Sequence, residues 1–134
     1  MFEELFEAAS QRTMGININD DTHPWTKLIL DGKKTIETRN GPSLRPYVGR
    51  RVGIIRTGAK KKAMLVGYMT ITREIEYSSP EQFNADVDKH HVASDSTLYN
   101  GGKKYGYVVK DVKRVDPRPV DYRGIVARQI DDEQ

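Results

Sequence analysis

Short segments of β-type sequence, separated by turn residues, fill most of this 134-residue chain. Segments that alternate polar and apolar residues, or that are rich in β-branched residues, are typical of strands. Asn40-Gly41-Pro42 and Asn100-Gly101-Gly102 contain residues that break such segments. The sequence therefore predicts strands at residues 16–19, 34–39, 51–56, 64–72 (with an extension toward 77), 105–112 and 125–130.

Helical patterns are few and short. Residues 2–13 and residues 24–31 carry apolar side chains at helical spacing, and Gly32 is suited to end the second helix. A third helix begins at Ser79-Pro80-Glu81-Gln82, which has the sequence of a capping box. Because strands and helices do not alternate regularly, we expect an α+β domain. Its sheet would be a small barrel of five or six mostly antiparallel strands with two or three flanking helices.

Composition excludes several kinds of site. The chain has no cysteine, which removes disulfide frameworks, cysteine nucleophiles and cysteine-ligated metals. The histidines His23, His90 and His91 lack the spacing of a zinc pair, and there is neither a phosphate-binding glycine loop nor a dinucleotide fingerprint. We therefore expect neither a metal nor a cofactor.

Charge and hydropathy limit the partners. No apolar run is long enough to cross a bilayer and no secretion signal is seen, so we expect a cytoplasmic protein without a membrane partner. The chain has 22 Lys and Arg against 19 Asp and Glu, a net charge of +3. This mild excess permits a nucleic-acid partner without requiring one.

Polar residues concentrate at one predicted helix–strand corner. His23, Trp25, Lys34, Glu37 and Arg39 fall within seventeen positions. Glu37 and Arg39 are two residues apart in a strand, so their side chains point to the same side and can reach one another or a shared ligand. One interpretation is an ion pair that holds the corner together. The other is a polar site, in which Arg39 or Lys34 holds an anion or a carbonyl group and Glu37 orients a donor or moves a proton.

Two residues of this corner have a structural alternative. Strict alternation places Lys34 on the Ile36 side of the strand, so that it joins the site only if the chain bends after Gly32. Trp25 is the single tryptophan, and its helical spacing favours a core position over a ligand platform.

The helical pattern after Ser79 predicts different exposures for the adjacent histidines His90 and His91. Phe83, Val87 and His91 fall on one stripe of that helix. This pattern predicts a packed His91 and a more exposed His90, which would be the better candidate to touch a substrate.

The segment from His23-Pro24-Trp25 through the apolar run to Gly32-Lys33-Lys34-Thr-Ile-Glu37-Thr-Arg39 resembles the signature of ASCH domains, a branch of the PUA-like superfamily. That signature consists of Pro-Trp, an apolar helix and Gly-x-Lys-x-x-Glu-x-Arg. Further matches are Tyr47-Val-Gly49, Leu65-Val-Gly67, Gln82-Phe83, Tyr105-Gly-Tyr107 and Pro119-Val-Asp-Tyr122-Arg123-Gly124. The resemblance spans about Ile16 to Ile130, so we expect an ASCH domain over residues 16–134 after a helical extension over residues 1–15.

The resemblance implies a small β-barrel with a cleft beside the Gly-x-Lys-x-x-Glu-x-Arg strand, in which the family binds RNA or another nucleic acid. We therefore expect this chain to bind RNA, a nucleotide or a nucleoside there. The ligand-binding residues implied are Trp25, Lys34, Glu37 and Arg39, with Tyr47, Arg50 and Arg51 near the rim.

A hydrolase is the alternative. Some ASCH relatives are small amidohydrolases that remove the acetyl group from acetylcytidine, using a lysine and a threonine of this strand and a glutamate of the later helix. Here Lys34 matches the lysine, but Glu37 occupies the threonine position and residues 88–95 contain no glutamate. Other relatives are proposed to cleave RNA, for which Lys34 and His90 would form an acid–base pair. The catalytic candidates are thus Lys34, Glu37 and His90. A purely structural or protein-binding role would instead require a closed Glu37–Arg39 pair without an accessible pocket.

Overall fold

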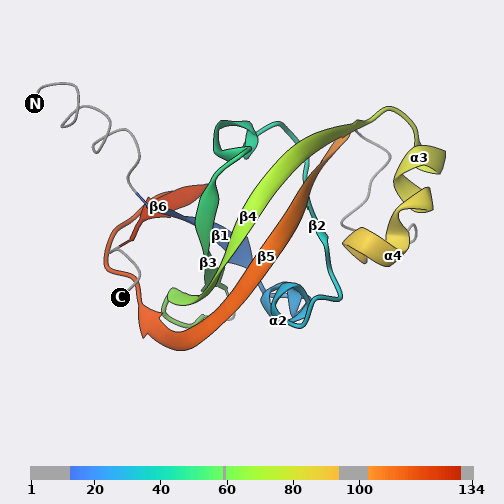
Figure 1. Ribbon diagram of the computed structural model, residues 1–134. Coiled ribbons are helices and arrows are strands. Elements are labelled where there is room, and N and C mark those ends of the chain that lie inside the picture. The colour runs from blue at the N-terminus through green and yellow to red at the C-terminus, as the bar shows by residue number, and fades with distance from the viewer. Residues whose placement is uncertain (1–12, 59, 94–102, 131–134) are drawn as a thin grey trace, which may run out of the picture.

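The strands form one open sheet. The computed structural model describes residues 13–58, 60–93 and 103–130, and Figure 1 shows their arrangement. In this part of the chain six strands follow the order β2-β5-β4-β3-β1-β6, and all neighbours are antiparallel except the parallel pair β1 and β3. The bounds are Met14–Asn19 (β1), Ile36–Arg39 (β2), Arg51–Thr57 (β3), Met64–Tyr77 (β4), Lys104–Pro119 (β5) and Ala127–Gln129 (β6). The expected α+β class and strand number are confirmed.

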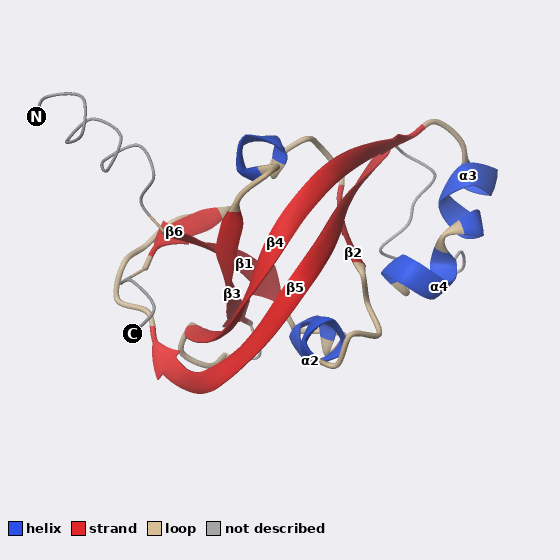
Figure 2. Cartoon of the chain, viewed as in Figure 1, coloured by secondary structure: helices blue, strands red, loops and turns tan. Residues whose placement is uncertain are grey.

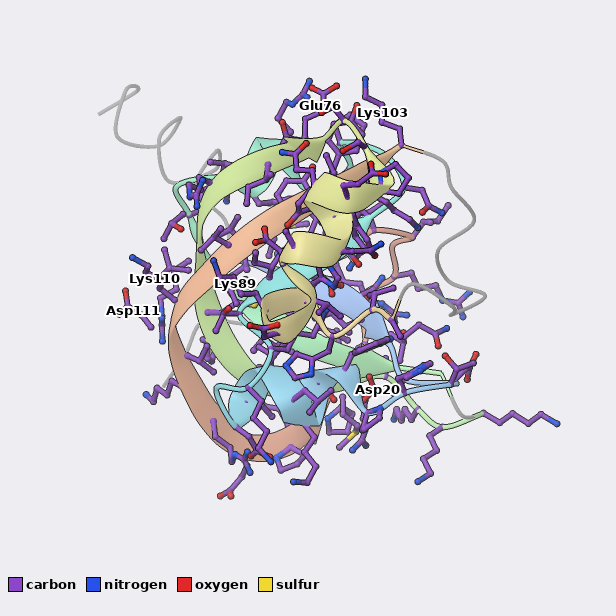
Figure 3. The ribbon with its side chains drawn as sticks, turned by 90° about the vertical axis from the view of Figure 1, so that its right-hand side faces the viewer. Asp20, Glu76, Lys89, Lys103, Lys110 and Asp111 are labelled. Carbon is purple, nitrogen blue, oxygen red and sulfur yellow. The ribbon has the colours of Figure 1, made fainter. Side chains whose placement is uncertain are left out.

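Two long strands give the molecule its shape. β4 has 14 residues and β5 has 16, and Figure 2 shows them as a curved ribbon along the length of the molecule. Their pairing contains three shifts of register, which let the ribbon bend while it stays paired. The extension of β4 to Tyr77 is confirmed. At one end of the ribbon Glu76 and Lys103 form an ion pair, on the opposite side of the molecule from α2 (Figure 3).

The expected closure into a barrel is wrong. β2 and β6 are the two edges of the sheet. β2 has only four residues and uses them to pair with β5. A side chain crosses the open side instead, since Arg39 Nη2 donates a hydrogen bond to the carbonyl oxygen of Asn17 in β1 at 2.9 Å. The space between β2 and β1 is therefore bridged by a side chain and not filled by a strand ladder.

The helices are short. They are α2 (Trp25–Leu30), α3 (Pro80–Ala85) and α4 (Val87–His90), with a 3-10 turn, η1, at Arg45–Tyr47. The capping prediction is confirmed, because Ser79 Oγ accepts from the Gln82 N–H at 3.1 Å. None of the described helices has the length and hydropathy needed to span a membrane.

The first strand begins slightly earlier in the chain than expected. β1 begins at Met14, two residues before the predicted strand, and pairs there with β6. The predicted helix over residues 2–13 falls almost entirely outside the described residues, as does the predicted turn at residues 100–102. The main core lies where α2 packs on the sheet and includes the fully buried Ile29 of α2, Ile16 of β1 and Tyr107 of β5.

Candidate nucleotide site

A pocket of about 610 Å³ opens at the unclosed side of the sheet. β1 and β2 form two of its walls, and α2, the beginning of β5 and the loops beside them complete it. Four of the seven expected ligand-binding residues line this pocket together: Trp25, Lys34, Glu37 and Arg39.

Lys34 lines the pocket because it precedes β2, which begins at Ile36 and not at Lys34 as predicted. Gly32 takes a left-handed φ of +75° after α2. The N–H groups of Lys33 and Lys34 then both donate to the carbonyl oxygen of Leu28, at 2.9 and 3.0 Å. This bend delays β2 until Ile36, so strict alternation does not apply to Lys34. Its side chain turns toward Glu37 and is 1% exposed.

Glu37 lies between two cations. Its Oε1 is 3.7 Å from Lys34 Nζ, and its Oε2 is 3.0 Å from Arg39 Nη2. Lys34 Nζ also donates to the carbonyl oxygen of His90 at 2.5 Å. Burial lowers the pKa of Lys34; Glu37 opposes this effect and Arg39 adds to it. The Glu37–Arg39 ion pair, one of the two interpretations of this corner, is present, and it is one side of a three-residue array that lines an open pocket.

Trp25 serves the core and the pocket at once. It is 9% exposed and packs in the main cluster, as its helical spacing predicts. Its indole also lines the pocket, and Lys34 Nζ lies 4.6 Å from the ring centroid. The ring of His23 stacks on the indole at 4.5 Å between centroids, with 12° between the planes. The indole is therefore held rigidly between the core and the pocket.

The structure adds pocket residues that sequence reasoning did not select. Lys104 is buried and its Nζ contacts Asn40 Oδ1; burial lowers the pKa of this lysine. Its only signal in the sequence is the Lys103-Lys104 cluster. Ile125 lines the pocket yet is 96% exposed. The Asn17 amide fixes its loop, donating to the carbonyl oxygens of Gly124 and Ile125 at 2.9 and 3.0 Å.

The expected exposure of His90 is wrong. The helix breaks at Asp86, so α4 restarts with a different facing, and His90 stacks on Phe83 at 4.0 Å between centroids. The His90 ring is fully buried, its Nε2 donates to the Phe83 carbonyl oxygen at 2.7 Å, and its Nδ1 accepts from the Val92 N–H at 2.9 Å. Both ring nitrogens are engaged, so His90 contributes to the site its backbone carbonyl and not an acid–base ring. Of the adjacent pair His90 and His91, His91 is the one that is partly exposed.

The three residues expected at the rim are not brought to this pocket. Arg50 lies 5.7 Å from the centre of the Tyr47 ring, and Arg51 donates to the Asp111 carbonyl oxygen at 3.1 Å. Arg51 begins β3, whereas Thr57 at the other end of the same strand lines the pocket. The rise of a strand places these two ends about 20 Å apart. The sheet therefore separates this basic pair from the Lys34 side chain.

Burial of His90 predicts an acid-dependent loss of stability. Burial lowers the pKa of His90 below its ordinary value of 6.5, so near that pH the unfolded histidine binds a proton that the native ring does not. The free energy of unfolding should therefore fall as pH decreases through 6.5 toward the folded-state pKa, by at most about 1.4 kcal/mol per pH unit. Urea unfolding between pH 7.5 and 5.5 measures this slope. His90→Gln should flatten it and His91→Gln should not. An equal slope in all three proteins would contradict the assignment.

Comparison with solved structures identifies the fold. The crystal structure of ZmASCH from Zymomonas mobilis superposes with a TM-score of 0.70 at 14% sequence identity, covering 90% of this chain and 89% of that one. Two single-substitution variants of that protein give TM-scores of 0.70 and 0.69 at 15% and 14% identity, covering 91% and 90% of this chain and 90% and 91% of theirs. This chain has the ASCH domain fold.

The likeness to the ASCH structures covers about nine-tenths of the chain. No protein-family model and no curated protein matches the sequence. The assignment of the ASCH fold therefore depends on the arrangement of the strands and helices, and the signature from His23 to Arg39 agrees with it.

Proposed function

We propose that this ASCH domain binds RNA and holds one nucleotide in the pocket between β1 and β2. The observation that carries the proposal is the Lys34–Glu37–Arg39 array, whose charged groups line a pocket of about 610 Å³. Buried charges are costly, and a folding core has no need of the buried Lys34 and Glu37 beside a partly exposed arginine in one open pocket. The pocket volume is in the range of small-ligand sites.

The chemistry of the pocket suits a nucleotide. Lys34, Arg39 and Lys104 supply positive charge for a phosphate or for carbonyl groups of a base, and Glu37 supplies an acceptor. Trp25 and Ile125 provide apolar surface for the flat face of a base. Unpaired bases of single-stranded RNA are recognised by this combination of apolar contact and edge hydrogen bonds. The resemblance of the signature residues to ASCH domains supports the same ligand class.

Binding of nucleoside monophosphates tests the proposal. Trp25 is the only tryptophan and lines the pocket, so its fluorescence should change when AMP, CMP, GMP or UMP binds. Arg39→Gln should weaken binding about tenfold, since it removes a charge-assisted contact. Arg73→Gln, an equal charge change outside the pocket, should bind as the wild type does. The proposal fails if none of the four changes the fluorescence, or if both variants bind equally.

A hydrolase acting on RNA or on a modified nucleoside is the second candidate. The observation that favours it is the buried amine of Lys34, because burial lowers its pKa and increases the fraction of the neutral, nucleophilic form. Glu37, 3.7 Å away, is placed to exchange a proton with it. Incubation with single-stranded RNA and with N4-acetylcytidine tests this function. Turnover that persists in Lys34→Ala would remove Lys34 from the mechanism.

A further inference from the structure

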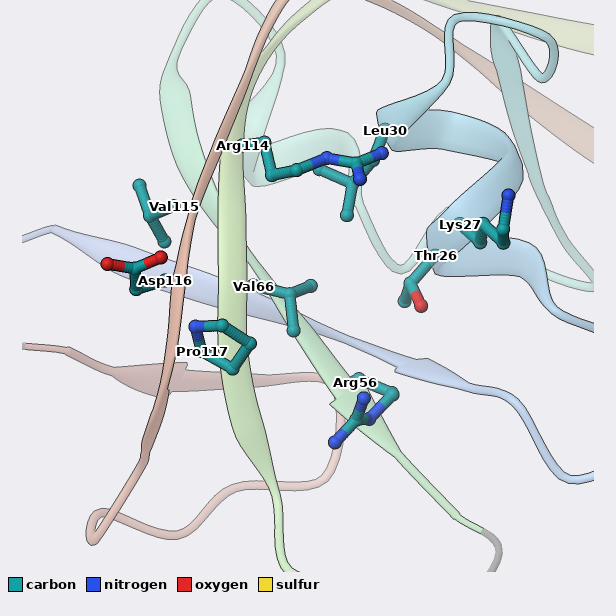
Figure 4. A pocket seen from close by; sticks show the side chains of 9 residues that line it. All are labelled: Thr26, Lys27, Leu30, Arg56, Val66, Arg114, Val115, Asp116 and Pro117. Atoms are coloured by element: carbon teal, nitrogen blue, oxygen red, sulfur yellow. The ribbon is translucent and has the colours of Figure 1, made fainter.

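A second hollow lies on the other side of α2. It has a volume of about 720 Å³ and is lined by α2, by Val66 of β4 and by residues 114–117 of β5. Figure 4 shows Val66 and Pro117 between two arginines, with Arg114 above them and Arg56 below. The hollow thus has an apolar floor with a guanidinium at each side.

A smaller hollow connects the second hollow with the nucleotide pocket. It has a volume of about 330 Å³ and is lined by the loop that enters α2 and by the end of β3. It shares Asp21, Thr22 and Thr57 with the nucleotide pocket. It shares Arg56 with the second hollow. The three hollows therefore adjoin one another around the beginning of α2, in a row that we call the path.

Arg56 is the cation at the junction of this path. Among the residues that the structure describes, its guanidinium has no side-chain hydrogen bond or ion pair, and it is partly buried. A guanidinium has five donors in a planar fork that suits phosphate oxygens. Arg114 by contrast is paired with Asp31 at 2.7 Å, and Lys27 is paired with the same carboxylate at 2.8 Å. Arg56 is thus an unpaired guanidinium at the point where two of the hollows meet, and the exposed Lys61 is a further cation of the connecting hollow.

Carboxylates on the path limit where a phosphate can lie. Asp20 is occupied, because its oxygens accept from Thr26 N–H at 3.2 Å and Thr26 Oγ1 at 2.5 Å. Asp21 lines the connecting hollow and Asp116 lines the second hollow. These charges disfavour a phosphate over the loop that enters α2. They leave the space beside Arg56 as the position for one.

We propose that single-stranded RNA continues from the nucleotide pocket around the beginning of α2 and places its next nucleotides in the second hollow. Arg56 binds a phosphate of the chain, and the apolar floor formed by Leu30, Val66 and Pro117 receives a base. This proposal rests on the proposed function, because it takes the nucleotide pocket as the first subsite. The chemistry required is that of a flexible polyanion with flat apolar groups, which a single nucleotide does not provide.

Comparison of a mononucleotide with an oligonucleotide tests the path. The probes are the best-binding nucleoside monophosphate and a seven-residue RNA of the same base, titrated against the full chain with Trp25 fluorescence as the signal. The RNA should bind at least about tenfold more tightly at low salt. Arg56→Gln should remove most of that gain and leave the mononucleotide unaffected. It should also reduce the slope of log affinity against log salt concentration by about 0.7, the value for one phosphate contact on a single strand.

The outcomes separate the two proposals. Arg73→Gln is the matched control. Arg56→Lys should retain part of the gain in affinity of the RNA over the mononucleotide. Unchanged melting temperatures of the variants exclude misfolding. If the RNA binds no more tightly than the mononucleotide, or if Arg56→Gln binds both probes as the wild type does, the path is wrong and the nucleotide pocket stands. If none of the four mononucleotides changes Trp25 fluorescence, the proposed function fails and this inference fails with it.

Discussion

Glu37→Gln is expected to lower the free energy of unfolding by about 3 kcal/mol, because it breaks a buried ion pair by removing one partner. The carboxylate is the counter-charge of two groups, Lys34 at 3.7 Å and Arg39 at 3.0 Å. The Lys34 side chain is 1% exposed, so little water can solvate the ammonium where the carboxylate is lost. A neutral amide leaves two cations facing one another in a poorly solvated site. Deprotonation of Lys34 limits the cost, so the loss should be smaller at alkaline pH.

Urea unfolding at pH 7 measures this effect against a matched control. Glu76→Gln makes the same chemical change in the exposed ion pair with Lys103 at the far end of the β4–β5 ribbon (Figure 3). Exposed pairs contribute little, so this variant should unfold at the wild-type urea concentration. Equal unfolding midpoints for the two variants would show that Glu37 is not the centre of a buried array.

The local pattern of the sequence predicted the corner that forms the site. Two-residue spacing placed Glu37 and Arg39 on one side of β2, where they form their ion pair. The capping box at Ser79 and the glycine after α2 were also read correctly, since each depends only on neighbours in sequence. Features fixed by contacts within a few residues were therefore predictable.

Features that depend on one irregular residue were predictable only where the sequence offers that residue as a signal. Lys34 reaches the pocket because a bend at Gly32 delays the strand, and this bend was the condition stated for Lys34 to join the site. His90 is buried because the helix breaks at Asp86, whose Oδ2 accepts from the Tyr77 hydroxyl at 2.7 Å. For His90 the continued helical period gave the wrong face, because a single break rotates every side chain that follows it.

Features that depend on pairing across the sheet were also missed. Lys104 is far from the corner in sequence, but the register that pairs Arg39 with Tyr105 brings it beside Asn40. The sheet stays open for a similar reason. β2 is an edge strand of only four residues, and its length is set by the bends that precede and follow it. Register is a tertiary property, so neither the second buried lysine nor the unclosed side of the sheet was visible in the sequence.

Lys34→Met is expected to separate function from stability. Ligand affinity should fall about ten- to a hundredfold, because the variant removes a charged donor from the pocket. The free energy of unfolding should change by no more than about 1 kcal/mol, because two effects offset one another. Methionine avoids the solvation cost of the buried ammonium, but the hydrogen bond to the His90 carbonyl oxygen, the 3.7 Å ion pair with Glu37 and the contact with the Trp25 ring are lost. Glu37 keeps Arg39 as its partner. Lys33→Met, one position earlier and outside the pocket, should leave affinity and stability unchanged.

The pH dependence of stability at alkaline pH tests whether the buried ammonium of Lys34 costs solvation in the folded protein. Burial lowers the pKa of Lys34 in the folded state below its ordinary value of 10.5. Between these two values the unfolded chain binds a proton that the folded chain has released, so the free energy of unfolding from this group rises with pH across that window. Urea unfolding from pH 7 to 10 should show this rise in full in the wild type and in Lys33→Met, and a smaller rise in Lys34→Met. The part that remains belongs to Lys104, whose pKa burial also lowers. A strongly destabilised Lys34→Met protein would mean that Lys34 serves mainly to hold the corner together. A Lys34→Met protein that keeps the full rise would mean that the rise does not come from the buried ammonium of Lys34.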